Sequence, residues 1–296
     1  MSWDRRLTLI GVAIVALAHP IAYLSAGDSQ AGLPSVEGFR LLTTRVCCSG
    51  EPVGREAFAQ IAALGIKTVV SVDGKAPDSE LAARVGLRYI HLPIGYDGVP
   101  LEVQDSLAHV LAGTTGLILV HCHHGKHRGP AAAAILAMMD TDARVSKEQA
   151  LKILEAAGTG SEYQGLWDSV RGFDPQKLGD ASLPLLPVAE VEPFVREMVH
   201  LDEAFDALQK IRTDGWIGES ARSAVAVFAE GYREALRVCR EREPAPAPEM
   251  VRLLEDASQR SSKFRELVHE GQGTNLSEHL TGLRQNCAEC HKRYRN

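Results

Sequence analysis

The sequence lacks the excess of positive charge that proteins binding nucleic acid usually carry. Its 32 Lys and Arg residues face 38 Asp and Glu residues, a formal net charge of −6, so composition gives no support for nucleic-acid binding. Cysteine is also sparse, and the spacing of the six cysteines does not suggest a dense disulfide framework. Cys47, Cys48 and Cys239 belong to no motif. Two of them could form a disulfide, or all three could be small buried residues.

Long apolar runs are missing as well, with one short run near the N-terminus. Arg5 and Arg6 precede the apolar stretch 7–18, and small residues follow it as far as Ala26. This arrangement is typical of an export signal, because the stretch is short for a membrane span. We therefore predict a signal peptide or an uncleaved N-terminal anchor in residues 1–30, and a periplasmic protein.

Residues 35–172 alternate strand-like and helix-like segments. β-rich runs occur at 41–50, 67–74, 87–93 and 116–122, and helical spacing occurs at 55–65, 79–86, 101–113, 130–140 and 146–158. Ser146 and Gln149 form a capping-box pattern at the start of the last of these. Such alternation predicts a layered α/β domain with a largely parallel sheet.

The character of the chain changes after residue 172. Residues 173–187 are rich in Pro, Gly and Asp and are predicted to be a linker. Residues 188–296 contain no β-rich run and carry four amphipathic helical patterns. We therefore predict two domains, the second an all-α four-helix bundle. The length of 296 residues accommodates both.

A C-x-x-C-H motif lies near the C-terminus, at Cys287, Cys290 and His291, and is followed by Lys-Arg-Tyr-Arg. The motif predicts covalent attachment of haem c. With its helical context, the segment 188–296 resembles cytochromes c′ and c-556. The resemblance implies that the two cysteines bind the haem and that His291 ligates the iron. Met198 is either the sixth ligand or a plain core residue, and His200 is expected to face solvent.

A second motif follows the apolar run 117–120. Here His121, Cys122, Gly125 and Arg128 fit the pattern HCxxGxxR, with a helix-forming alanine run behind it. In this context the segment 35–172 resembles the protein tyrosine and dual-specificity phosphatases that depend on cysteine. The resemblance implies a phosphoric monoester hydrolase that forms a cysteinyl-phosphate intermediate.

The chemistry of phosphate explains the spacing of this second motif. A tight loop at a helix N-terminus offers backbone N–H groups and the positive end of the helix dipole to an anion. Arg128 can grip two phosphate oxygens, and the same environment stabilises a thiolate at Cys122. His121 is expected to order the loop by hydrogen bonding, and Gly125 to permit its turn.

The leaving oxygen needs a proton from a carboxylic acid nearby. Asp97 is the best candidate, since it follows a strand by a short loop, where the phosphatases carry their acid; Asp105 and Asp73 are weaker alternatives. One departure from the family concerns Gly129, where a Ser or Thr usually assists thiolate departure. The departure predicts slow turnover, or a domain that binds phosphate without efficient hydrolysis.

The remaining polar side chains of the loop are His123, His124, Lys126 and His127. They form part of the predicted phosphate-binding loop, and they favour either a polyanionic substrate or generic phosphate binding. A metal site built from these histidines and His121 is disfavoured, because a loop that wraps an anion directs many of its side chains outward.

Two functional hypotheses follow. The first is an exported phosphatase fused to a haem c bundle, acting on a phosphorylated protein or a small polyanion. The second is a haem c electron-transfer or sensor protein whose phosphatase-like domain is weak or inactive. One oxidisable thiolate and one redox cofactor in the same chain suggest control of Cys122 by haem redox state or by a bound diatomic gas, and a redox partner.

Overall fold

The sheet of the N-terminal half is formed by five short, mostly apolar segments. The computed structural model describes residues 36–161, 163–212, 216, 218–271 and 275–294. Its strands are β1 (Arg40–Leu41), β2 (Val46–Ser49), β3 (Ile66–Ser71), β4 (Arg88–His91) and β5 (Leu117–His121). They lie in the order β1-β2-β5-β3-β4, and only β1 runs antiparallel to its neighbour. The predicted α/β sheet is confirmed: it is largely parallel, and β1 makes it a mixed sheet.

The first predicted strand, 41–50, is in fact a hairpin of β1 and β2. The hydroxyl of Thr43 accepts hydrogen bonds from the backbone N–H groups of Arg45 and Val46, both at 3.0 Å. These bonds hold the chain in a turn, as Thr side chains commonly do. The single-strand prediction was wrong here because the turn depends on a side-chain acceptor.

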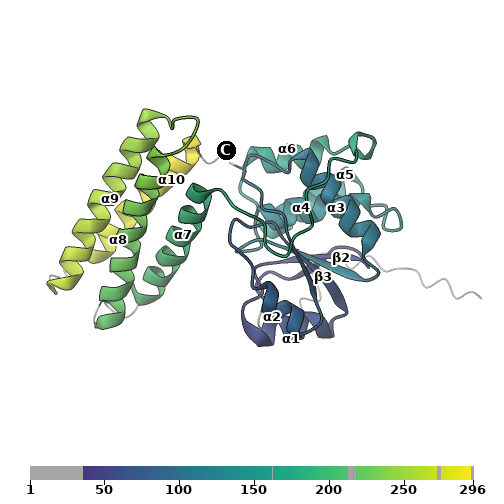
Figure 1. Ribbon diagram of the computed structural model, residues 1–296, viewed down its shortest axis with the longest axis horizontal. Coiled ribbons are helices and arrows are strands. Elements are labelled where there is room, and N and C mark those ends of the chain that lie inside the picture. The colour runs from purple at the N-terminus through teal and green to yellow at the C-terminus, as the bar shows by residue number, and fades with distance from the viewer. Residues whose placement is uncertain (1–35, 162, 213–215, 217, 272–274, 295–296) are drawn as a thin grey trace, which may run out of the picture. The chain divides into compact units, whose positions relative to one another are not determined.

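Helices cover both faces of the sheet. They are α1 (Gly54–Ala63), α2 (Ser79–Arg84), α3 (Leu101–Gly113), α4 (Arg128–Met139), α5 (Lys147–Ala157) and α6 (Gln164–Gly172). Phe58 of α1 packs in one buried cluster with Val69 and Leu119, while Ile135 of α4 packs in another with Val120. Figure 1 shows α1 and α2 on one side of the strands and α3 to α6 on the other. The α/β layering therefore follows the period-2 alternation of the strands.

The start of α5 is where the sequence predicts it, whereas α4 starts earlier than predicted. At α5, Ser146 and Gln149 form the predicted capping box. Helix α4 begins at Arg128, two residues before the proline that marked its predicted start. The arginine of the motif thus belongs to the first turn of a helix.

The segment predicted to be a linker follows the surface of the α/β layers closely. It contains a short 3₁₀ helix, η1 (Pro175–Lys177). The backbone N–H of Gly179 donates to Asp105 at 2.9 Å, and that of Leu183 donates to Ser106 at 2.8 Å. Further along, His91 bonds to this stretch through its own N–H and through Nδ1, which accepts from Ala189 at 3.1 Å.

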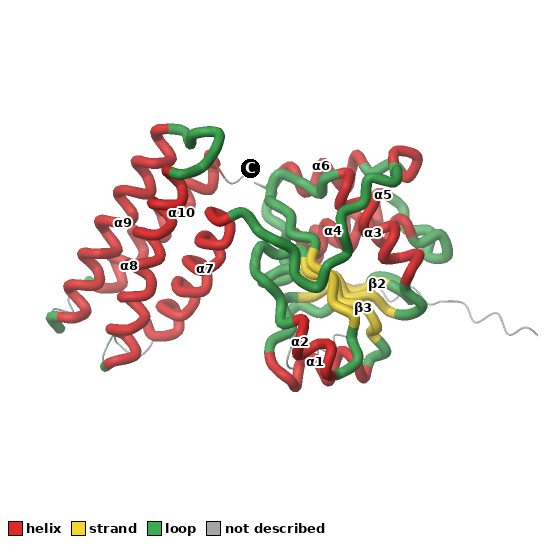
Figure 2. The backbone as a smooth tube through the Cα atoms, viewed as in Figure 1, coloured by secondary structure: helices red, strands yellow, loops and turns green. Residues whose placement is uncertain are grey.

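The described part of the chain after residue 190 is helical. It consists of α7 (Pro193–Ile211), α8 (Glu219–Arg240), α9 (Pro248–His269) and α10 (Leu276–Tyr294), and each helix packs against the next. Figure 2 shows these helices in red, whereas the yellow strands all belong to the earlier segment. One apolar cluster joins the four helices; its members include Phe194, Phe228, Phe264 and Leu280. The helical C-terminal region is confirmed, and its closure into a four-helix bundle stays a prediction.

The predicted signal or anchor, residues 1–30, lies outside the described residues. Among the helices that the structure does describe, none is long and apolar enough to cross a membrane. All six cysteines are described, and none of them forms a disulfide.

Candidate functional site

The candidate site lies at the carboxyl ends of the parallel strands. The loops after β2, β3, β4 and β5 carry Glu51, Asp73, Asp97 and Cys122, respectively. Because these strands are parallel and adjacent, their carboxyl ends meet at one edge of the sheet, where open α/β folds bind ligands. The fold thus brings together residues that are far apart in the sequence.

Cys122 lies between the end of β5 and the first turn of α4. Its side chain is buried, with 4% exposed. A Cβ atom placed on Gly129 would lie 3.3 Å from the Cys122 sulfur and 2.9 Å from its backbone nitrogen. The sulfur therefore rests against the N-terminal turn of α4, where free N–H groups and the helix dipole favour negative charge.

His121 orders the start of the loop. The ring is buried, Nε2 hydrogen-bonds with the Tyr89 hydroxyl, and Nδ1 lies 3.4 Å from the carbonyl oxygen of Cys122. Burial lowers the pKa of His121 to about 4, so the ring is neutral near pH 7. This placement agrees with the ordering role expected for His121.

The loop itself is fixed by contacts of its backbone. Gly125 has φ of 65°, and a side chain on it would collide with the backbone of Ser49 and Gly50. The carbonyl of Lys126 accepts a hydrogen bond of 2.6 Å from the Thr159 hydroxyl, while the Lys126 side chain is exposed. Glycine is therefore required at position 125 for two reasons, its left-handed φ and the close approach of β2.

Arg128 is buried, with 8% of the residue exposed. Its Nη2 donates to Asp73 at 2.6 Å, its Nη1 donates to the carbonyl of Ile94 at 3.5 Å, and its guanidinium lies 4.6 Å from the centre of the Tyr96 ring. Burial alone would lower the Arg128 pKa, but Tyr96 and Asp73 raise it above its ordinary value. Among the described residues, none accepts a hydrogen bond from the buried Nε.

Asp73 holds the arginine and the loop together. One carboxylate oxygen accepts from Arg128 and, at 2.8 Å, from the backbone N–H of His123; the other accepts from the N–H of Lys75 at 2.9 Å. Burial would raise the Asp73 pKa, but Arg128 and these N–H donors lower it. A carboxylate with a lowered pKa is a poor proton donor, so Asp73 is placed as a positioning residue and not as the alternative acid.

The two other candidate acids are placed differently. Asp105 is buried in α3 and accepts a hydrogen bond from the backbone N–H of Gly179, so it anchors the stretch after α6. Asp97 is exposed on the loop after β4. That loop is fixed on one side of Asp97 by the bond from Arg128 to Ile94, and on the other by the Val99 N–H, which donates to Ser169 at 2.9 Å. Of the three, Asp97 alone is solvent-accessible on a loop held against Arg128.

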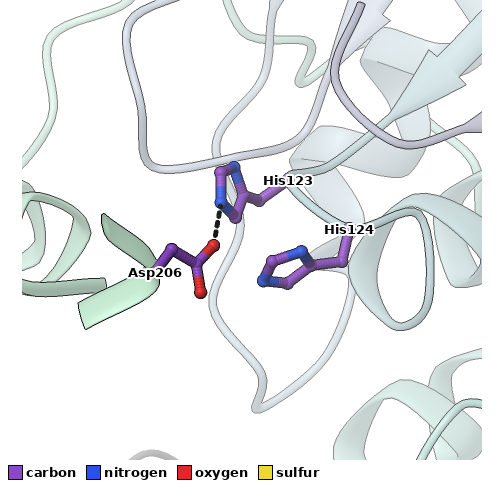
Figure 3. A group of neighbouring side chains, drawn as sticks. All are labelled: His123, His124 and Asp206. Carbon is purple, nitrogen blue, oxygen red and sulfur yellow. Dashed lines mark ion pairs between the residues drawn. The ribbon is translucent and has the colours of Figure 1, made fainter. Parts of the chain in front are cut away.

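The histidines of the loop diverge from one another. His121 turns inward, and His127 lies against the Tyr163 ring with centroids 4.5 Å apart and accepts from Gly160 at 3.3 Å. His123 and His124 point the other way, toward Asp206 of α7, as Figure 3 shows. The four imidazoles therefore do not converge on one point.

Two carboxylates face the ring of His123. Its Nδ1 lies 3.4 Å from Glu51 and its Nε2 lies 3.6 Å from Asp206. The hydrogen bond to Glu51, opposed by burial and helped by Asp73 and Asp202, raises the His123 pKa to about 9. Sequence reasoning missed Glu51 and Asp206 because neither belongs to a motif.

The haem motif lies on α10. Cys287 and Cys290 are half-buried against the apolar cluster of the helical region, and the Cys287 sulfur lies 2.8 Å from the Tyr232 hydroxyl. Met198 packs on the same cluster, while His200 is exposed and faces Glu197. These are the inward and outward placements predicted for α7, and they do not test ligation.

Comparison with known proteins gives structural likeness only. No family model matches the chain, and no curated protein matches it. TpbA of P. aeruginosa is 23% identical over 49% of this chain and 95% of its own, with a TM-score of 0.39. Tk-PTP is 16% identical over 47% of this chain and 96% of its own, with a TM-score of 0.38. Human DUSP28 is 17% identical over 47% of this chain and 92% of its own, with a TM-score of 0.35. Each likeness extends over about half of this chain and nearly all of the other.

Proposed function

We propose that the segment 35–172 hydrolyses phosphate monoesters through a cysteinyl-phosphate intermediate. The observation that carries the proposal is the buried Arg128, whose Nε lacks a partner among the described residues and whose helix supports the Cys122 sulfur. A buried donor left unpaired costs free energy unless a ligand satisfies it. A phosphate oxygen supplies that acceptor, and the guanidinium then binds it in a charge-assisted geometry.

The proposed reaction has two steps. The Cys122 thiolate attacks phosphorus, the bond to the leaving oxygen breaks, and Asp97 donates a proton to that oxygen. Water then attacks the cysteinyl phosphate, giving up a proton to Asp97 and releasing inorganic phosphate and the thiolate. Arg128 and the loop N–H groups stabilise the negative charge in both steps.

The substrate class is a phosphorylated protein or a small polyanion. Lys126, an exposed cation of the loop two residues before the buried Arg128, supports this substrate class. The charge of His123, by contrast, is compensated by Glu51 and Asp206.

The N-terminal segment supports export to the periplasm, and the C-x-x-C-H motif supports covalent haem c there. Cys287 and Cys290 would hold the haem and His291 would ligate its iron, with Met198 as the sixth-ligand candidate. The donor set fits this group, since the two thiols, neither of them in a disulfide, lie three residues apart on one helix, against an apolar cluster. When bound, the haem would supply one-electron or gas-binding chemistry. A weak phosphatase serving a haem sensor is the alternative, and Gly129 favours it.

Replacement of Cys122 tests the proposed reaction. The Cys122→Ser chain should hydrolyse an aryl phosphate at least about 10³-fold more slowly than the wild type, because the nucleophile is lost. Cys239→Ala, which removes a buried thiol from the helical region, should keep the wild-type rate. Equal rates for wild type and Cys122→Ser, measured by release of the chromogenic alcohol, would falsify the proposal.

Replacement of Asp73 tests the buried ion pair. Because the folded-state pKa of Asp73 is lowered, its stabilisation is present at neutral pH and is lost as pH falls through that pKa. Asp73→Asn should therefore lower the free energy of unfolding by about 3 kcal/mol at pH 7, and by progressively less in acid. Urea denaturation over a pH series measures this. Asp168→Asn, which breaks an exposed pair with Arg171, should cost under about 0.5 kcal/mol; a pH-independent Asp73 effect would refute the assignment.

Replacement of Gly129 separates its two effects. Ser at this position adds the hydroxyl that assists thiolate departure, but its Cβ would press on the Cys122 backbone at 2.9 Å. We expect both Gly129→Ser and Gly129→Ala to lower kcat, since both carry the Cβ. A Ser variant faster than wild type, with a slower Ala variant, would show that the missing hydroxyl limits turnover instead.

Haem attachment has a direct test. Protein from a host that matures haem c should show a Soret band that persists after denaturation and acid–acetone extraction, because the haem is held by thioethers. Cys287→Ala combined with Cys290→Ala should lose it. Absence of the band in the wild type would remove the haem assignment without affecting the phosphatase assay.

A further inference from the structure

A group of metal-ligating side chains lies beside the phosphate loop. The potential ligand atoms of His123, His124 and Asp206 all lie within 4.8 Å of one another, and the two imidazoles face the carboxylate (Figure 3). We propose that these three side chains bind a divalent transition-metal ion of the zinc class. The inference stands apart from the proposed phosphatase reaction and from the haem motif.

The spacing of the three side chains is close to what zinc requires. Ligand atoms around tetrahedral zinc lie about 3.4 Å apart, since each is about 2.1 Å from the metal. The His123 Nε2 is already 3.6 Å from the nearer Asp206 oxygen. The His124 ligand atom lies within 4.8 Å of the other two, so His124 must move closer when the ion binds.

The surroundings orient His123 as a ligand, once zinc has displaced the proton from its Nε2. Its Nδ1 faces Glu51 at 3.4 Å, which directs Nε2 toward Asp206. A carboxylate on the far ring nitrogen is the usual support of a metal-binding histidine, because it fixes the tautomer and raises the basicity of the ligand. Glu51 is itself held by Lys75 at 3.2 Å, and Lys75 is held by Glu203 of α7 at 2.6 Å.

The ligand types select the metal. Two imidazole nitrogens and one carboxylate suit zinc and its transition-metal neighbours, whereas magnesium and calcium prefer oxygen ligands alone. Three protein ligands leave a fourth position for water. Since His123 and His124 belong to the loop and Asp206 to α7, a bound ion would join these two elements.

Zinc titration of the full-length, haem-loaded protein by calorimetry tests the site. Asp206→Asn and His124→Gln should each weaken zinc binding by at least about 10-fold, and Glu51→Gln by a similar factor through His123. Glu197→Gln is the matched control on α7, since Glu197 pairs with His200 outside the cluster, and this variant should bind zinc as the wild type does. Far-UV circular dichroism of each variant without zinc checks that it folds.

The C-terminal cysteines are a competing zinc site wherever they carry no haem. A chain with Cys287→Ser and Cys290→Ser should therefore keep the zinc site, and should lose it when Asp206→Asn is added. The proposal is overturned if Asp206→Asn binds zinc as tightly as the wild type, or if zinc binding disappears with the cysteines alone.

Discussion

One buried carboxylate, that of Asp73, holds the candidate site in shape. The same oxygen accepts from the guanidinium of Arg128 and from the backbone N–H of His123. It thereby joins the end of β3 to the loop after β5 and to the first turn of α4. Buried charges of this kind are costly unless they are paired, so each partner depends on the other. The ion pair with Asp73 therefore fixes the orientation of the Arg128 guanidinium, and with it the position of the unpaired Nε.

Two close approaches of backbone complete the shape of the loop. At Gly125 the loop touches the end of β2, and at Gly129 the helix touches Cys122. Neither position tolerates a Cβ without movement, so both glycines are structural requirements. For Gly129 this gives a physical reason why no larger residue stands there: even the Cβ of a serine would need space that this chain does not have.

Much of this arrangement could be predicted from the sequence, because its signals are local. The strand before Cys122, the helix after Gly129 and the capping box at Ser146 each depend on a few adjacent residues. The partners of Arg128 and His123 could not be predicted, since Asp73, Glu51 and Asp206 come from distant segments and belong to no motif. Only the sheet order, which sets β2 and β3 on either side of β5, brings the first two to the loop.

The carboxylates around the loop also change how its charge is understood. Four histidines, a lysine and an arginine within eight residues suggest a strongly cationic surface. In the structure, however, Arg128 is paired with Asp73, His123 lies between Glu51 and Asp206, and burial keeps His121 neutral. What remains for an anion is the set of loop N–H groups, one guanidinium nitrogen and the exposed Lys126. Selectivity for a phosphate group would therefore come from directed donors at the helix N-terminus more than from net charge, because donors fixed in place lose little entropy on binding.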